Sequence, residues 1–453
     1  MNKTKIQLDE NNNEMPPLKK SRKNLREIVS QPETGETQLC HKHVKQVQSE
    51  WAYLPAEVLA KIFEYLVKQD TGMLPCLLRL SKVCRHWRNT ANIPFLWSDL
   101  HFAPYLVKSQ QAFKKNIKSF ELMAEAHFSS VESLTCSGFT MIAPVLIKTV
   151  LNYARKILIL SIHRCGSIST KNCLQTVADR HSSSLQQLCI SHTSIPTSDI
   201  RKILSGAGEQ LTHLELFNPE FPRDIQISLI HLRNLNILKI ECGRSFNISN
   251  IKSLKHLRVL HLTNMHLDTR GCLEVEFPEL EDLDLSINEY CTANEPDNQM
   301  LALMMSKSRN IRNVNLSNRR MDVACLIPSL ENCLKIEVLD ISGFYGSSLS
   351  ALLLHLSGSL KEIHLDYYDN LNARLCSCAD ILYWQSISIL SMCHTNISGM
   401  VLEMLTCFSN IQEFNLDVCR YLPRGCRRRW KKKEMPLLKA RLLDANASET
   451  LAS

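Results

Sequence analysis

Cysteine and histidine, the residues that most often carry metal or nucleophilic chemistry, are plentiful in this chain, which has 18 cysteines and 16 histidines. Only two short stretches bring them close together, Cys40–His43 and Cys376–Cys378. A structural zinc site needs a second set of ligands at a defined spacing, and neither stretch has one. We therefore expect no metal and no cofactor, and we interpret the cysteines as reduced, mostly buried, small hydrophobic residues.

Signatures of enzymes are missing from the sequence as well. It contains no P-loop, no G-x-S-x-G, no H-E-x-x-H and no protein-kinase motif set. Cys419 and Cys426 lie near basic residues that could lower a thiol pKa, but no partner base is apparent. The sequence thus predicts a protein that binds other molecules and does no catalysis.

The elements that must position any binding site follow a triplet pattern, L-x-x-L-x-L, from Val131 onward. It recurs about every 25 residues, which is typical of leucine-rich repeats, and the second unit is weaker because it begins with Arg155. Each unit should give a short strand, a turn and a helix, with the strands on the concave side of a horseshoe. The first positions fall at residues 131, 155, 185, 211, 235, 257, 280, 311, 336, 360, 387 and 411.

Carboxylates recur between the repeat leucines in the second half of this array. Side chains alternate along a strand, so residues between the buried positions should face the concave side. There the last six repeats carry no Lys or Arg and seven acids, which are Asp282, Asp284, Asp340, Glu362, Asp366, Glu413 and Asp417. They predict an acidic surface that could bind a basic segment of a substrate. The alternative is that Asp and Ser are common beside repeat leucines.

A helical pattern precedes the repeats, in residues 49–102. Its apolar residues are Val58, Leu59, Ile62, Phe63 and Leu66 in a first helix, and Leu80, Val83, Cys84 and Trp87 in a second. Pro94–Trp97 closes the segment. Three short helices make a poor core by themselves, so part of this apolar surface should face a partner.

The two ends differ in charge from the body. From Arg420 onward, ten basic residues and three acids leave +7 of the total +8, so a nucleic-acid-binding body is not favoured. Residues 423–453 are expected to be a basic tail. It could be solvated, act as an import signal, bind nucleic acid or acidic lipid, or lie across the acidic face.

Residues 1–48 are expected to be a disordered arm, in which the basic run Pro16–Lys23 is either an import signal or an ordinary solvated stretch. The first ten residues are too polar for a secretory signal, and no run of 18 apolar residues occurs. We therefore expect no membrane partner and a location in the cytoplasm, the nucleus or both.

Four short motifs together resemble the F-box. They are Leu54-Pro55, Ile62-Phe63-x-Tyr65-Leu66, Val83-Cys84-Arg85-x-Trp87 and Pro94-x-Leu96-Trp97. The linker Lys68–Cys76 is longer than usual. An F-box followed by about twelve irregular repeats, 103–422, is similar to the F-box and leucine-rich-repeat protein family, an α/β fold. Gly72–Pro75 and Cys419–Gly425 resemble, more narrowly, the branch called F-box and leucine-rich repeat protein six.

The resemblance implies a substrate-recognition subunit of an SCF-type cullin–RING ubiquitin ligase, which directs its substrate to proteasomal degradation. The F-box would dock the Skp adaptor, which bridges to the cullin and RING subunits, and the repeats would bind the substrate. The adaptor-binding residues would be Leu54, Pro55, Ile62, Phe63, Leu66, Val83, Trp87, Pro94, Leu96 and Trp97. Alternatives are a non-degradative scaffold that binds the adaptor only, and a repeat protein with a vestigial F-box.

Overall fold

The computed structural model describes most of the chain beyond residue 52. The described residues are 53–69, 73–102, 113, 116–139, 142–166, 174–217, 223–268, 275–288, 305–330, 332–368, 370–371, 385–398 and 400–452. The predicted disordered arm and both cysteine-rich stretches lie outside these ranges. The chain divides into two compact units, 1–55 and 56–453, and the fold described below is that of the second.

Three helices open this unit, because their apolar residues recur at helical spacing. Leu59, Ala60 and Phe63 are buried on the first helix, and the Phe63 ring packs edge-on against Trp87 with 5.3 Å between centroids. The Sγ atom of Cys84 caps the third helix by accepting a hydrogen bond from the Trp87 N–H. The elements are α2 (Ala56–Gln69), α3 (Met73–Leu80), α4 (Arg85–Ala91) and the 3₁₀ turn η1 (Pro94–Trp97), and α2 contacts the other three.

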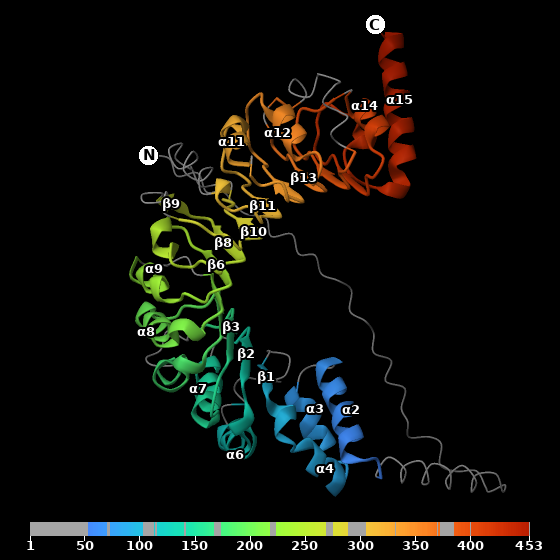
Figure 1. The fold of residues 1–453 in the computed structure, drawn as a ribbon. Helices are drawn as coiled ribbons and strands as arrows, with labels where there is room; N and C mark the ends of the chain where they lie inside the picture. Colours follow the sequence, from blue (N-terminus) through green and yellow to red (C-terminus); the bar gives the residue numbers. More distant parts are fainter. Residues whose placement is uncertain are drawn as a thin grey trace, which may run out of the picture. The chain divides into compact units, whose positions relative to one another are not determined.

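One sheet of fourteen strands runs through the rest of the unit, with β1 directly after η1 (Figure 1). Its strands are β1 (Asp99–Phe102), β2 (Ser133–Ser137), β3 (Ile159–His163), β4 (Gln187–Ser191), β5 (His213–Phe217), β6 (Ile237–Glu241), β8 (Val259–Thr263), β10 (Asp282–Asp284), β11 (Asn313–Asn315), β12 (Val338–Asp340), β13 (Glu362–His364), β14 (Ile389–Ser391), β15 (Glu413–Asn415) and β16 (Arg429–Lys431). Neighbours are parallel except for the antiparallel pair β15–β16. Strands β7 (Ser245–Asn247) and β9 (His266–Asp268) form a separate pair.

Helices and short helical turns connect the strands and cover one face of the sheet, as Figure 1 shows. The helices are α6 (Ile117–His127), α7 (Ala143–Tyr153), α8 (Thr197–Ala207), α9 (Arg223–Ser228), α11 (Ile327–Leu330), α12 (Leu349–Leu356) and α14 (Met400–Cys407). The turns are η3 (Phe128–Ser130), η4 (Val177–His181), η5 (Ser182–Ser184), η6 (Gly208–Gln210), η7 (Leu229–His231), η8 (Ile248–Ile251) and η10 (Val323–Cys325). The expectation of a helix in every repeat is therefore met only in part.

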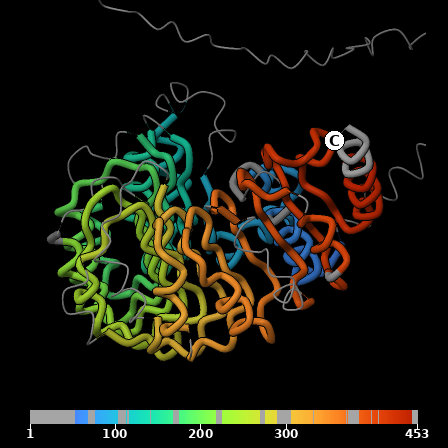
Figure 2. Tube along the Cα trace, turned by 90° about the horizontal axis from the view of Figure 1, so that it is seen from above, coloured from blue at the N-terminus to red at the C-terminus, as the bar shows by residue number. Residues whose placement is uncertain are grey.

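The predicted fold class is confirmed: a helical segment is followed by a solenoid of parallel strands, whose successive coils are seen in Figure 2. Leaving aside β1 and β16, the other twelve strands of the sheet correspond to the twelve predicted triplets. One register was wrong. The second repeat begins at Ile157, not Arg155, because Ile157, Leu160 and Ile162 are all fully buried.

The strands end in a tight turn at the eighth position of most repeats. The residue there adopts a positive φ in nine of them, and glycine stands at only two of these positions, Gly138 and Gly343. The other seven are Arg164, His192, Asn264, Asn318, Tyr367, His394 and Val418. Side chains at this position are turned out of the repeat, because the left-handed backbone ends the strand.

The C-terminal segment is not the tail expected from its charge. Strand β16 pairs with β15, and Trp430 between its two exposed cations is fully buried. The turns η12 (Arg424–Cys426) and η13 (Lys432–Glu434) flank this strand, and α15 (Met435–Ala452) follows. The prediction of a solvated tail was wrong because a few apolar residues among the basic ones, Cys426, Trp430, Leu438 and Leu442, are buried. Among the described helices, none is long and apolar enough to span a membrane.

Candidate protein-interaction surfaces

Helix α2 has one broad apolar side, and only part of it is buried inside the protein. Leu59 and Phe63 face the other helices and have no exposed surface. Val58 and Tyr65 lie on the outer flank of this side, Leu66 lies at its border next to Leu59, and the three are 45%, 60% and 37% exposed. We call the second set, together with the half-buried Ile62, the outer stripe of α2. An apolar stripe held in water on so small a domain is typical of a binding surface.

Three of the predicted adaptor-binding residues lie inside the protein. Phe63 is 0%, Leu96 4% and Trp97 2% exposed, so they offer almost no surface to a partner in this structure. The Trp97 ring stacks on His127 of α6 with 4.2 Å between centroids, and its Nε1 donates to the Ala91 carbonyl at 2.8 Å. Trp97 therefore joins the helices to the first repeat.

The other predicted residues reach the surface to different degrees. Val83 is 59% exposed, and Pro55, Leu66 and Pro94 are exposed as well. Leu54, Ile62 and Trp87 are half-buried. The sequence reasoning missed further exposed apolar side chains, which are Tyr53, Val58, Tyr65, Leu78 and Phe95. For Val58 and Tyr65, the spacing with Ile62 could have revealed the outer flank of the apolar side of α2.

The seven predicted carboxylates lie on the inner face of the sheet, between buried repeat residues, and all are half-buried. Two of them belong to a repeated turn. The backbone N–H groups of Ser286 and Ser342 donate to Asp284 Oδ1 and Asp340 Oδ1, each at 2.9 Å. Asn315 and Asn415 accept the same bond in their own repeats, at 3.0 and 3.1 Å. This position therefore selects a short side-chain acceptor, with or without charge.

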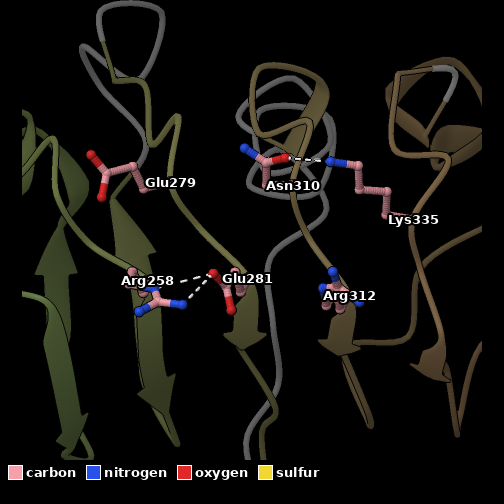
Figure 3. Close-up of a pocket in the computed structure, with 6 residues that line it drawn as sticks. All are labelled: Arg258, Glu279, Glu281, Asn310, Arg312 and Lys335. Atoms are coloured by element: carbon pink, nitrogen blue, oxygen red, sulfur yellow. Dashed lines mark hydrogen bonds and ion pairs between the residues drawn. The ribbon is translucent and has the colours of Figure 1, made fainter.

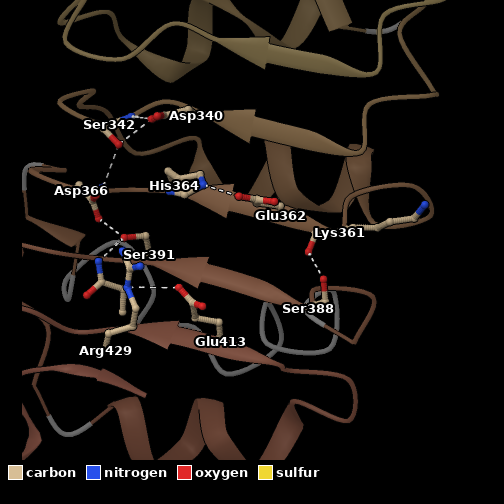
Figure 4. A network of polar contacts seen from close by, with 11 residues as sticks. Asp340, Ser342, Lys361, Glu362, His364, Asp366, Ser388, Ser391, Glu413 and Arg429 are labelled. Atoms are coloured by element: carbon tan, nitrogen blue, oxygen red, sulfur yellow. Dashed lines mark hydrogen bonds and ion pairs between the residues drawn. The ribbon is translucent and has the colours of Figure 1, made fainter. Parts of the chain in front are cut away.

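Other carboxylates of the inner face contact basic side chains of the same chain. Asp282 Oδ2 lies 3.2 Å from His261 Nε2, and Glu362 Oε1 lies 2.8 Å from His364 Nε2. Glu413 Oε1 lies 3.2 Å from Nε of Arg429 on β16, as Figure 4 shows. A basic residue of the C-terminal segment thus forms an ion pair with an acid of the inner face, because β16 pairs with β15.

A negative field remains at the C-terminal ends of β13 to β15. Asp366 Oδ1 accepts a hydrogen bond from Ser391 Oγ at 2.6 Å, which Figure 4 shows. It also accepts one from the Cys393 N–H at 2.6 Å. Burial first, and then the carboxylates of Asp366 and Asp417, raise the pKa of the Cys393 thiol to about 11. Burial also raises the pKa of Asp340. The negative charges of Asp366 and Asp417 therefore both act at the position of Cys393.

Exposed rings stand beside these acids. Tyr367 and His394, both at the eighth repeat position, stack with 4.4 Å between centroids at an angle of 11°. Val418 occupies the same position in the next repeat and is 43% exposed, and Tyr421 beyond it is 71% exposed. We call the three rings of Tyr367, His394 and Tyr421, together with the aliphatic Val418, the aromatic ridge. Sequence reasoning missed it because no single repeat displays it.

The other ends of the strands carry charges that alternate from repeat to repeat. Arg258 bonds Glu281 at 2.7 Å, and Glu337 bonds Arg312 at 2.7 Å and Lys361 at 2.6 Å. A hollow of about 180 Å³ opens there (Figure 3). It is lined by Arg258, Glu279, Glu281, Asn310, Arg312 and Lys335. Because most of these charges are already paired across neighbouring repeats, the hollow has little net field to offer a ligand.

The basic C-terminal cap is held by its own aromatic and carboxylate groups. The Arg428 guanidinium lies 3.8 Å from the centre of the Trp430 ring and bonds Glu434 at 2.8 Å. The pKa of Cys419 and Cys426 is raised and not lowered, because burial is the largest effect on both thiols. The charge of Arg441 lowers the pKa of Cys426, but it is outweighed by burial.

Comparison with known proteins agrees with this geometry over part of the chain. Residues 51–103 match the family described as F-box-like. The chain is 31% identical over 117 residues to F-box/LRR-repeat protein 21 of Bos taurus, and 32% identical over 118 residues to that of Mus musculus. Each match covers 23% of this chain and 26% of the relative, so the chain spans about a quarter of the length of these curated relatives.

Among solved structures, an internalin from Listeria monocytogenes matches 67% of this chain and 81% of its own, with 14% identity and a TM-score of 0.44. Residues 51–103 resemble an F-box-like domain, and a part of the chain is similar to F-box/LRR-repeat protein 21.

Proposed function

We propose that this protein is the substrate-recognition subunit of an SCF-type cullin–RING ubiquitin ligase. The observation that carries the proposal is the outer stripe of α2, which lies within an F-box-like domain and is left uncovered by the protein's own core. The stripe would dock a Skp-type adaptor, and the adaptor would connect to cullin and RING subunits. The protein itself would do no chemistry, but would hold a substrate close to the conjugating enzyme.

The adaptor surface proposed here differs from the one that the motifs suggest. Val58 and Leu66 replace Phe63 and Trp97 as the anchors, because only exposed side chains can lose further surface on binding. A central apolar anchor of an interface is typically worth about 2 kcal/mol or more. Two such anchors would therefore contribute a large part of a micromolar or tighter affinity.

The test is a Val58→Glu/Leu66→Glu variant in a pull-down with purified Skp adaptor. We expect adaptor binding to fall at least about 100-fold, because two charges would be buried without partners. The control is Leu122→Glu on α6, since Leu122 is 68% exposed and lies in the repeat array. The Leu122→Glu control should bind the adaptor as the unchanged chain does. If the Val58→Glu/Leu66→Glu variant also binds it equally well, the proposal is wrong.

A substrate would bind the inner face near the aromatic ridge. What supports this choice is the pair of converging carboxylates, Asp366 and Asp417, beside the stacked rings of Tyr367 and His394. Carboxylates next to aromatic faces suit an arginine or lysine side chain of a partner. Asp284 and Asp340, by contrast, serve turns of the repeats, so they are weaker candidates for substrate contacts.

A scaffold that binds the adaptor without delivering substrates is the alternative function. Co-purification with the cullin, together with ubiquitination of a captured protein, would separate the two. Membership of the branch called F-box and leucine-rich repeat protein six, and a location in the cytoplasm or nucleus, remain proposals that rest on sequence alone.

A further inference from the structure

Three potential metal ligands meet on the inner face of the sheet, far from the F-box-like domain in sequence. Cys189 of β4 is the register partner of Glu215 of β5, and His213 lies two residues before Glu215 on the same strand. One donor atom of each residue lies within 4.8 Å of the other two. All three side chains project from the same side of two hydrogen-bonded strands, so the backbone holds them in fixed relation.

The histidine at the centre of this cluster contacts the carboxylate of its neighbour. His213 Nε2 lies 3.0 Å from Glu215 Oε1 as an ion pair, although the two groups do not have the geometry of a hydrogen bond.

The cluster already attracts cations. Glu215 Oε1 lies 3.0 Å from both His213 Nε2 and Lys239 Nζ of β6. His213 first, and then Lys239, hold the pKa of Glu215 at about 2. The Lys239 ammonium therefore neutralises the same carboxylate charge that a bound metal ion would neutralise.

We propose that Cys189, His213 and Glu215 form a binding site for a divalent metal ion of the Zn²⁺ class. A thiolate, an imidazole and a carboxylate are the ligand types that Zn²⁺ accepts. Bonds of about 2.0–2.3 Å to a common centre require the donor atoms to approach one another by only about 1 Å. Three protein ligands leave a fourth position open for water or for a side chain of a bound protein.

A positive charge competes with the metal. The Lys239 ammonium on β6 lies 3.0 Å from Glu215 Oε1, so a metal ion must displace it from this carboxylate. Metal affinity should therefore rise when the lysine charge is removed.

The test is a Co²⁺ titration of the reduced, metal-free, full-length chain, followed by the thiolate-to-cobalt absorption and repeated in competition with Zn²⁺. We expect the unchanged chain to bind one equivalent of Co²⁺ with this absorption. The Cys189→Ser variant should lose both the bound equivalent and the absorption. His213→Gln should weaken the affinity at least about tenfold, and Lys239→Met should strengthen it by a similar factor.

The control is Cys325→Ser, because Cys325 is a half-buried free thiol that belongs to no such group of ligands among the described residues. Its titration should match that of the unchanged chain. Equal thermal unfolding of the variants would show that each one is folded. The site is disproved if Cys189→Ser keeps the same equivalent and absorption, or if neither the unchanged chain nor Lys239→Met binds Co²⁺ at pH 8. Adaptor binding through α2 is independent of either result.

Discussion

Val418 shows, at the scale of one residue, how the repeat geometry overrides local preference. Its φ is 58°, a left-handed conformation that a β-branched side chain adopts only at a cost. Two other repeats place a glycine at the same position, Gly138 and Gly343. The turn of nine repeats has this backbone, because the strand ends there and the chain crosses to the outer layer.

Replacing Val418 with glycine should therefore stabilise the protein. The left-handed conformation costs a branched residue about 1–2 kcal/mol, and glycine avoids this cost. Glycine also has more freedom in the unfolded chain, which lowers the free energy of unfolding by about 0.5–1 kcal/mol. We expect the free energy of unfolding to rise by up to about 1 kcal/mol in a denaturant titration. Ile227→Gly is the control, since Ile227 is exposed in helix α9. That change should destabilise, and a Val418→Gly variant that loses as much stability would contradict the argument.

His213 gives the stability of the metal-free protein a definite pH dependence. Its folded pKa of about 9 is above the ordinary value of 6.5, so its contribution is full below pH 6.5 and is lost as the pH rises towards 9. Glu215, with a folded pKa of about 2, contributes above pH 4.5 and loses its effect as the pH falls towards 2. Together they favour stability between about pH 4.5 and 6.5.

We expect the thermal midpoint, measured with a chelator present, to fall between pH 6.5 and 9 more steeply in the unchanged chain than in His213→Gln. The imidazole is near a carboxylate only in the folded state, so the variant lacks this proton linkage. His256→Gln is the control, because His256 is largely exposed beside Glu279. Parallel curves for the unchanged chain and His213→Gln would refute the linkage.

At the scale of elements, the inner face separates structural acids from acids that could bind a partner. The turn acceptor is Asp in two repeats and Asn in two others, so the carboxylate charge is not needed for the turn. Substitution of these aspartates by asparagine therefore keeps the hydrogen bonds and removes only the charge. This makes the acidic row testable without damage to the sheet.

The triple variant Asp284→Asn/Asp340→Asn/Asp366→Asn should keep its thermal midpoint within a few degrees. If the acidic row binds partners, capture of an arginine-rich probe peptide should weaken and its dependence on salt should flatten, because the field is reduced. Asp417→Asn with Tyr367→Ala should weaken capture further if the aromatic ridge is the contact. If neither variant alters peptide binding, the acids are a feature of the repeats alone.

At the scale of the whole molecule, both described ends of the sheet are closed by different means. The first strand, β1, follows the helical domain, and Trp97 joins that domain to α6. The last repeat is covered by β16 and α15, with Trp430 buried beneath them. An uncovered end of a solenoid exposes both apolar surface and unpaired strand groups.

Removal of all residues after Pro423 should therefore lower the thermal midpoint and cause self-association, which size-exclusion chromatography would detect. The cause would be the open edge of β15, not the loss of charge. The control is the full-length Arg424→Gln/Lys432→Gln/Lys433→Gln variant, whose three changed residues are exposed. It should remain monomeric. A truncated chain that stays monomeric and as stable would show that β16 and α15 are not a cap.

The sequence by itself determined the repeat array and the helical domain before it. Buried positions recur at fixed spacing because each repeat must bury the same leucines against its neighbours, and that requirement is visible in the order of residues. The inner-face placement of Asp282, Asp284 and the other acids followed from strand alternation alone. The second repeat was misplaced by two residues because Arg155 and Ile157 compete for one register.

Only the tertiary structure decided which side chains are available for binding. Phe63 and Trp97 match the F-box motifs, but packing against Trp87 and His127 buries them, and sequence periodicity does not say which part of a broad apolar side is covered. The basic residues near the C-terminus fold onto the last repeat because β15 leaves an open edge. Cys189 and His213 are 24 residues apart in sequence, and it is the pairing of β4 with β5 that brings them together.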